Sequence, residues 1–175
     1  MTHALPRRDA LPSVTLQPGG QYVGMDGKKK LKRDALRKLM SHETVSDAIV
    51  FCNRKADIST VYKSLKKHGF TAGQLHGDMS QPARMEMLAG FKNKDFNILV
   101  CSDVAARGLD VPNLSHVFNY DVPSHAEDYV HRIGRTGRAG NEGHAYTLAL
   151  PEDRSEGRRG GEGSRCAGGR GQYRE

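Results

Sequence analysis

The chain has 175 residues, 37% of them hydrophobic, which suits one domain with its own core and a tail. Lys and Arg number 27 against 20 Asp and Glu, and the resulting formal charge of +7 favours a polyanionic partner. The three cysteines show neither metal-ligand spacing nor a disulfide framework, and no apolar run is long enough for a membrane helix. We therefore expect a cytoplasmic protein with no membrane segment.

The two ends of the chain differ in composition from its middle. Residues 1–13 carry two prolines and mixed charge, which predicts an extended N-terminal segment. Residues 152–175 hold seven glycines, six arginines and five acids, and too few apolar residues to offset the entropy of ordering. This composition predicts a disordered tail, which is either an RNA-binding tract or a passive linker. The folded domain is expected at residues 14–151.

Strands and helices are predicted to alternate through this domain. Continuous apolar runs indicate buried strands, and apolar residues at helical spacing indicate helices. The strands are expected at 14–25, 48–52, 71–75, 97–101, 115–120 and 143–150, and the helices at 28–40, 56–68, 81–91, 102–107 and 126–133. The alternation implies a mostly parallel sheet with helices on both faces, an α/β fold. The first helix has a basic face, which is either simply solvated or in contact with phosphate.

Polar residues directly follow four of the predicted strands. Ligands of parallel sheets bind beyond the carboxyl ends of the strands, so these residues mark the expected site. They are Asn53-Arg54, His76-Gly77-Asp78, Ser102-Asp103 and Tyr120-Asp121. After His76-Gly77, the exposed amides at the start of the helix over 81–91, with Arg84 one turn in, favour a sugar-phosphate chain.

The stretch from His131 to Gly140 contains three arginines at intervals of three residues, with glycines between them. Planar guanidinium groups on an open segment suit a dense anion such as a nucleotide phosphate. If a helix that begins near His125 ends within this stretch, Arg132 and Arg135 share a face and Arg138 follows in a turn. The alternative is a basic surface turn that forms salt bridges without specificity.

These motifs resemble those of the DEAD-box RNA helicases. His131–Arg138 reads H-R-I-G-R-T-G-R and matches the last helicase motif of that family at every position. The other motifs follow the family's order: H-G-D and Q-x-x-R at 76–84, S-D-V-A-A-R-G-L-D at 102–110, and Y-D-x-P at 120–123. The resemblance covers roughly residues 14–151 and implies a RecA-like, P-loop NTPase-type fold in three layers. The phrase over 121–140 looks most like bacterial RhlE-type members.

The resemblance also implies roles for individual residues. Arg135 and Arg138 would reach the γ-phosphate, with Arg138 as the arginine finger. Gly108 and Asp110 would bind the nucleotide, Asp110 at the ribose hydroxyls. RNA would contact Asn53, Arg54, Gly77, Gln81, Arg84, Ser102 and Asp103, and the neighbouring domain would contact His131 and Arg132.

Three positions depart from the family pattern. Arg54 stands where the family usually has threonine, which removes a threonine-specific RNA contact and leaves an electrostatic one. Cys101-Ser102 replaces the usual Ala-Thr, and Ser102 keeps the hydroxyl that bonds a phosphate or caps a helix.

Neither a G-x-x-x-x-G-K-[ST] phosphate loop nor the D-E-A-D motif occurs in the sequence. The resemblance therefore implies the C-terminal half of an ATP-dependent RNA helicase, inactive in ATP hydrolysis without the first RecA-like domain. Its partners would be RNA, ATP with Mg²⁺, and that first domain, which would supply the Mg²⁺ ligands. The alternative is a stand-alone RNA-binding or protein-docking module without catalysis.

Overall fold

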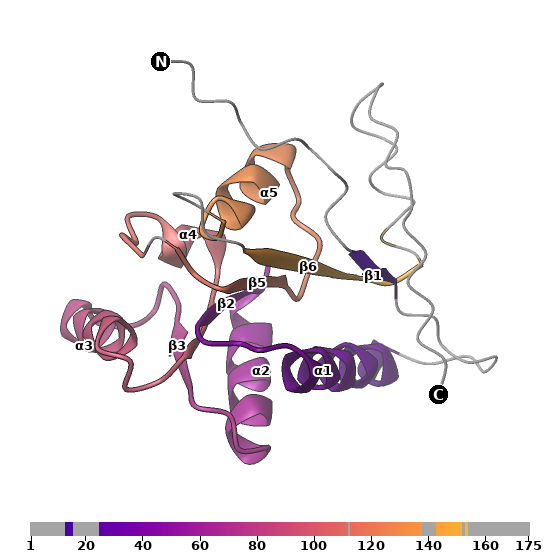
Figure 1. Ribbon diagram of the computed structural model, residues 1–175, viewed down its shortest axis with the longest axis horizontal. Helices are drawn as coiled ribbons and strands as arrows, with labels where there is room; N and C mark the ends of the chain where they lie inside the picture. Colours follow the sequence, from indigo (N-terminus) through magenta and orange to yellow (C-terminus); the bar gives the residue numbers. More distant parts are fainter. Residues whose placement is uncertain (1–12, 16–24, 112, 138–142, 152, 154–175) are drawn as a thin grey trace.

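The computed structural model describes residues 13–15, 25–111, 113–137, 143–151 and 153 (Figure 1). The predicted N-terminal segment and glycine-arginine tail lie outside these ranges, apart from Ser13 and Asp153. Arg138 also lies outside the described residues.

Strands and helices alternate along the chain as predicted. The strands are β1 (Ser13–Thr15), β2 (Ala48–Phe51), β3 (Ala72–Leu75), β4 (Ile98–Cys101), β5 (His116–Asn119) and β6 (His144–Ala149). The helices are α1 (Met25–His42), α2 (Lys55–Lys67), α3 (Gln81–Lys92), α4 (Asp103–Ala106) and α5 (Ala126–Ile133). The strand predicted over 14–25 is the main difference, because β1 ends at Thr15 and Met25 already belongs to α1.

The strands form one sheet in the order β1-β6-β5-β2-β4-β3, and every neighbouring pair is parallel. Strand β2 is central, and its Val50 lies opposite Val100 of β4 and Phe118 of β5. The predicted parallel sheet is confirmed, and it places all carboxyl ends of the strands along one edge.

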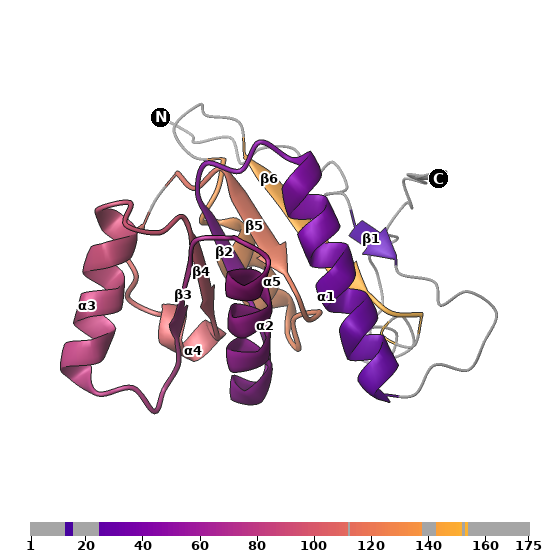
Figure 2. The same cartoon turned by 90° about the horizontal axis from the view of Figure 1, so that it is seen from below.

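Helices cover both faces of this sheet, as predicted. Figures 1 and 2 show α1 and α2 on one face and α4 and α5 on the other. Side chains that alternate along each strand divide the core accordingly. Val50 belongs to the cluster with Leu36 of α1 and Ile58 of α2, whereas Phe51 belongs to the cluster with Phe91 of α3 and Ala105 of α4. The domain is therefore built of three layers.

The local sequence explains where several helices begin and end. The side chain of Ser80 accepts a hydrogen bond from the amide of Ala83 at the start of α3, where Pro82 has no N–H group that would need an acceptor. Gly69 has φ +86°, a left-handed conformation that ends the helical path after α2. Among the described helices, none has the length and apolar character required to cross a membrane.

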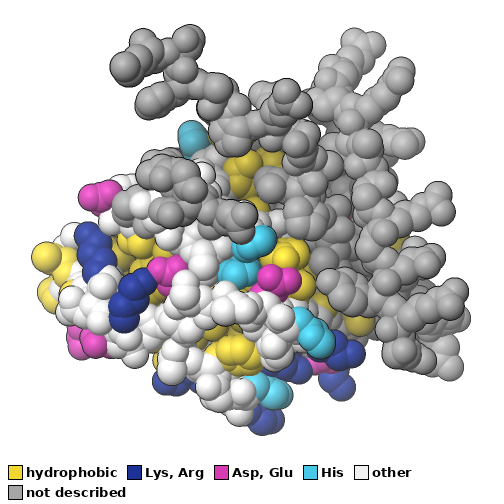
Figure 3. All heavy atoms as spheres, viewed as in Figure 1, with side chains coloured by type: hydrophobic (Ala, Val, Ile, Leu, Met, Phe, Trp, Pro, Cys, Tyr) yellow, Lys and Arg dark blue, Asp and Glu magenta, His cyan; other side chains and the backbone are white. Residues whose placement is uncertain are grey.

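The basic face predicted for the first helix is present and continues on α2. Figure 3 shows Lys and Arg side chains along the edge formed by these two helices. The exposed lysines of the two helices are Lys30, Lys38, Lys55, Lys63, Lys66 and Lys67.

Candidate functional site

The polar residues after β2 and β5 are joined at the carboxyl edge of the sheet. The amide nitrogen of Asn53 donates to the Asp121 carboxylate at 2.8 Å, and the Asn53 side chain donates to the carbonyl of Val122 at 2.8 Å. This arrangement follows from the parallel pairing of β2 with β5. The residues predicted after these two strands therefore lie together.

Arg132 lies at the centre of the edge and is 1% exposed. Its Nε and Nη2 atoms donate to the two carboxylate oxygens of Asp103, each at 2.6 Å. Nη1 donates to the carbonyl of Asp121 at 2.9 Å, and Nη2 donates to the Asn53 side-chain oxygen at 2.7 Å. The guanidinium also lies over the ring of Phe51, 5.1 Å from its centroid. One side chain of α5 thus joins the ends of β2, β4 and β5.

The guanidinium donors of Arg132 are used inside this domain. The reason is the orientation of α5, whose sheet-facing side carries Arg132 and the partly buried Ile133, while Val130 and His131 are exposed. The expected contact of Arg132 with a neighbouring domain remains a prediction. The interdomain role predicted for His131 remains a prediction.

Asp103 is likewise engaged within the domain. Its two oxygens accept the paired hydrogen bonds of Arg132, a geometry that planar guanidinium and carboxylate groups share. A carboxylate also repels phosphate. The expected contact of Asp103 with RNA remains a prediction.

Residues predicted to contact RNA gather around the beginning of α3 and the short helix α4. Ser102 caps α4, because its hydroxyl accepts a hydrogen bond from the amide of Ala105 at 3.3 Å. Arg84 of α3 donates to the carbonyl of Ala105 at 3.5 Å, so α3 and α4 lie beside each other. Gln81 and Gly77 are exposed, and a Cβ added at Gly77 would meet nothing within 4 Å. The surface is therefore open to a backbone that approaches Gly77.

Arg135 lies at the C-terminal end of α4. It follows Gly134, the C-cap of α5, so it belongs to a turn. The expected helix face shared by Arg132 and Arg135 is therefore absent. Its guanidinium donates to the carbonyls of Leu109 and Ala106, the latter at 3.2 Å. The side chain is partly exposed and lines a cavity of ≈ 70 Å³ together with His131.

Gly108 and Asp110 follow α4 on the same side as Arg135. Both are exposed, and Gly108 has φ +77°, which an L side chain adopts with strain. Nothing lies within 4 Å of a Cβ added at Gly108. The exposed Asp110 carboxylate is an acceptor for hydroxyl donors, and the open space beside Gly108 leaves room for a ligand.

The thiols and carboxylates of the described residues offer little redox or metal chemistry. Cys52 and Cys101 are buried and unpaired, as expected for small core residues. Burial raises the pKa of the Cys101 thiol to about 12, so it stays protonated. Within the described ranges, no three His, Cys, Asp or Glu side chains group as metal ligands.

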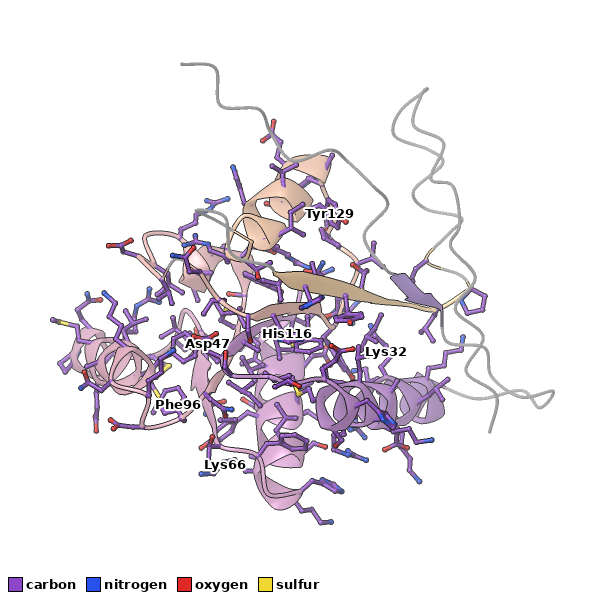
Figure 4. All side chains as sticks on the ribbon, in the orientation of Figure 1. Lys32, Asp47, Lys66, Phe96, His116 and Tyr129 are labelled. Atoms are coloured by element: carbon purple, nitrogen blue, oxygen red, sulfur yellow. The ribbon has the colours of Figure 1, made fainter. Side chains whose placement is uncertain are left out.

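A lysine of α1 also contributes to the edge, and the sequence motifs did not reveal it. The ammonium group of Lys32 donates to the Asp121 carboxylate at 2.6 Å and lies 4.6 Å from the centre of the Tyr120 ring. Figure 4 shows Lys32 between α1 and the sheet. The available signal was weak: Lys32 is one of several basic residues in α1, and Tyr120-Asp121 is a turn motif 89 residues away.

Comparison with known proteins identifies the family. The family model described as "Helicase conserved C-terminal domain" matches residues 31–140. The ATP-dependent RNA helicase RhlB of Klebsiella pneumoniae is 48% identical over 121 residues, which are 69% of this chain and 29% of the relative. The ATP-dependent RNA helicase CshA of Listeria monocytogenes is 45% identical over 125 residues, 71% of this chain and 24% of the relative. The chain thus spans less than a third of the length of these two relatives.

A solved structure agrees with the sequence relatives. The E. coli DEAD-box protein SrmB, in a crystal structure with regulator of ribonuclease activity A, superposes with a TM-score of 0.69 at 36% identity. The match covers 75% of this chain and 79% of that one. The fold is therefore the RecA-like fold predicted from the motifs. The chain belongs to the helicase conserved C-terminal domain family, as the C-terminal domain of a DEAD-box RNA helicase.

Proposed function

We propose that this chain forms one side of an ATP- and RNA-binding cleft and completes an ATP hydrolase together with a first RecA-like domain. The observation that carries the proposal is the position of α4. Ser102 caps its start, and Arg135 donates to the carbonyl of Ala106 at its end and to that of Leu109 beyond it. This helix of four residues therefore lies between Ser102, which is predicted to contact RNA, and the segment with Gly108 and Asp110, which is predicted to bind nucleotide.

The RNA side would bind the sugar-phosphate backbone of a single strand. Gly77 leaves space for a close approach, while Arg54, Gln81, Arg84 and Ser102 offer exposed or partly exposed donors. Contacts of this kind position RNA without reading its bases, so we expect weak sequence preference and strong salt dependence.

The nucleotide side would consist of Gly108, Asp110, Arg135 and Arg138. Bound ATP supplies the phosphoryl group whose transfer to water is the reaction of the complete enzyme. Asp110 would accept hydrogen bonds from ribose hydroxyls, and the two arginines would stabilise phosphate charge, with Arg138 as the finger. We expect the Mg²⁺ ligands in the first domain, since this sequence contains no phosphate loop and no D-E-A-D motif.

Arg132 would link the two sides. It keeps the end of α5, and hence the turn with Arg135, attached to Asp103 and Asn53 at the RNA side. Asp103 and Arg132 are therefore proposed as positioning residues.

Among bacterial helicases we propose an RhlE-type member. The proposal rests on the phrase over 121–140 alone, and the sequence of the adjoining first domain decides it.

The test is ATP hydrolysis by the 175-residue chain with and without a separately prepared first domain and RNA. We expect activity only when both domains and RNA are present, and Arg138→Ala should lower it by about 10³-fold or more with modest loss of ATP binding. Equal loss of ATP binding and hydrolysis would contradict the finger role. If a fused two-domain protein is inactive but the chain alone binds RNA without ATP, the chain is a binding module.

A further inference from the structure

A cavity of ≈ 440 Å³ lies beside the predicted RNA-binding residues, outside the nucleotide side of the domain. It opens between the beginning of α1 and the turn that follows β5. Lys28, Lys29 and Lys32 of α1 line it, together with Arg54 at the start of α2. Its size is within the range of pockets that hold small organic groups, and one nucleotide of RNA is of this scale.

The charges around the cavity favour an anion. Among the described residues that line it, four cationic side chains face three carboxylates, those of Asp57, Asp121 and Asp153, which is a surplus of one positive charge. Each carboxylate is already engaged inside the protein. Asp57 pairs with Lys29 at 3.2 Å, Asp121 with Lys32 at 2.6 Å, and Asp153 accepts from the amide of Leu150 at 2.7 Å.

The lysines retain donors after these pairings. An ammonium group carries three N–H donors, and Lys29 and Lys32 each give one carboxylate oxygen a hydrogen bond or ion pair. Lys29 is 40% exposed at its side chain, and Arg54 is exposed as well. The carboxylates thus hold Lys29 and Lys32 in place while donors of these lysines remain for a phosphate.

The cavity is continuous with the predicted RNA track. Asn53 and Arg54, which are predicted to contact RNA, also line the cavity. Val122 and Pro123 form an apolar part of its wall, against which a ribose or base could pack. An RNA strand that passes Arg54 would therefore meet a basic pocket next, and not open solvent.

We infer that this cavity binds one further nucleotide of the RNA strand, with its phosphate on Lys28, Lys29 and Arg54. The inference rests on the proposed function, because it extends that function's RNA track onto α1. It assigns a binding role to the part of the basic helix that lies at the carboxyl edge of the sheet. The lysines at the other end of α2, such as Lys66, have no share in this role.

The test measures equilibrium binding of the 175-residue chain to labelled single-stranded RNAs of about five and about ten nucleotides. The pocket variant is Lys28→Gln with Lys29→Gln. The matched control is Lys66→Gln with Lys67→Gln, which removes the same charge from two exposed residues at the far end of α2. Ser124→Glu places a negative charge at an exposed position of the cavity wall and guards against a folding defect in the pocket variant.

The cavity variants are the Lys28→Gln, Lys29→Gln double variant and Ser124→Glu. We expect both to bind the longer RNA about tenfold more weakly than the unchanged chain does, and to bind the shorter RNA with unchanged affinity. The control should change neither affinity by more than about twofold. The slope of log affinity against log salt should fall by about 0.7 for each phosphate that the protein no longer binds, and only for the cavity variants.

Arg84→Gln separates failure of this inference from failure of the proposed function. If Arg84→Gln weakens both RNAs while the cavity variants match the control, the inference is overturned and the RNA track stands. If the unchanged chain binds neither RNA, both fall. An acidic peptide is added as a competitor for the longer RNA. If it displaces that RNA with the same potency as unlabelled RNA, the cavity is assigned to a protein partner and its assignment to RNA is overturned.

Discussion

Asp103 and Arg132 form a paired hydrogen bond, 2.6 Å at each contact, across 29 residues of sequence. The arginine is buried, and the carboxylate is its one anionic side-chain partner among the described residues. Asp103 therefore neutralises the positive charge that α5 buries against the sheet.

The first prediction concerns this pair. Asp103→Asn should lower the free energy of unfolding by about 3 to 5 kcal/mol, because it leaves the buried guanidinium of Arg132 without its counter-charge. Arg132→Met should cost roughly 1.5 to 3 kcal/mol, since it removes the hydrogen bonds to a charged group but leaves Asp103 with a side chain that is 25% exposed and can be hydrated. Urea denaturation measures both.

The double variant supplies the decisive comparison. If the pair interacts as described, the double variant loses clearly less than the sum of the two single changes. Asp110→Asn is the control, because Asp110 is exposed, and it should shift stability by less than about 0.5 kcal/mol. Additive losses would show that the two side chains act independently.

A second prediction concerns the packing of Phe96 over two glycines. A Cβ added at Gly73 would lie 2.5 Å from atoms of the Phe96 ring, and one at Gly90 would lie 2.9 Å from it. Gly73→Ala should therefore destabilise the domain by about 1 to 3 kcal/mol through overpacking. Thermal or urea unfolding tests this, and Phe96→Leu in the same chain should recover part of the loss.

A third prediction concerns Gly77, which has open space around it. Gly77→Ala should leave the unfolding transition within about 0.5 kcal/mol of the unchanged chain. RNA affinity should fall, because the added methyl group occupies the place where the proposed track brings the RNA backbone close. Unchanged RNA affinity in a fluorescence titration would remove Gly77 from the track.

A fourth prediction concerns pH and the buried side chain of His116. This residue begins β5, at the amino ends of the strands, opposite the carboxyl ends that form the candidate site. Burial lowers the pKa of His116 below its ordinary value of 6.5, despite a hydrogen bond with Glu43. Figure 4 shows His116 near the centre of the molecule, and its ring stacks on that of His144 at a centroid distance of 5.1 Å. The unfolded chain thus takes up this proton more readily, so stability falls as pH drops below about 6.5.

His116→Phe isolates this contribution. One proton changes the free energy of unfolding by at most about 1.4 kcal/mol per pH unit. The variant should lose the part of the slope that belongs to His116 just below pH 6.5. The carboxyl of Glu43 acts at lower pH, because the hydrogen bond from Tyr146 lowers its pKa below 4.5. Identical pH profiles for both chains would contradict the prediction.

The sequence predicted the elements well, for a physical reason. Strands such as Ala48–Phe51 are buried on both faces, so their apolar runs are continuous and easily found. The parallel sheet followed from the alternation of strands and helices. Strand β1 was predicted less well, because its flanking sequence has neither a long apolar run nor a helical period.

The motifs name candidate site residues, but they do not give the geometry of those residues. A motif such as H-R-I-G-R shows that arginines are present, but not which of them is buried. The signal for Arg132 was its position next to Ile133, an apolar residue of α5 that packs against the core. Lys32 could not be assigned to Asp121 from the sequence, because tertiary packing alone brings them together.

The pairing of strands sets an order for assembly. Strand β2 leaves the ribosome before its neighbours β4 and β5, which follow it by about 50 and about 70 residues, and the chain must close these loops before the pairs form. Arg132 is synthesised later than all three strands whose ends it joins. A nascent chain that stops before α5 therefore lacks the guanidinium that unites those ends, and competence to bind a ligand appears only when folding of the domain is nearly complete.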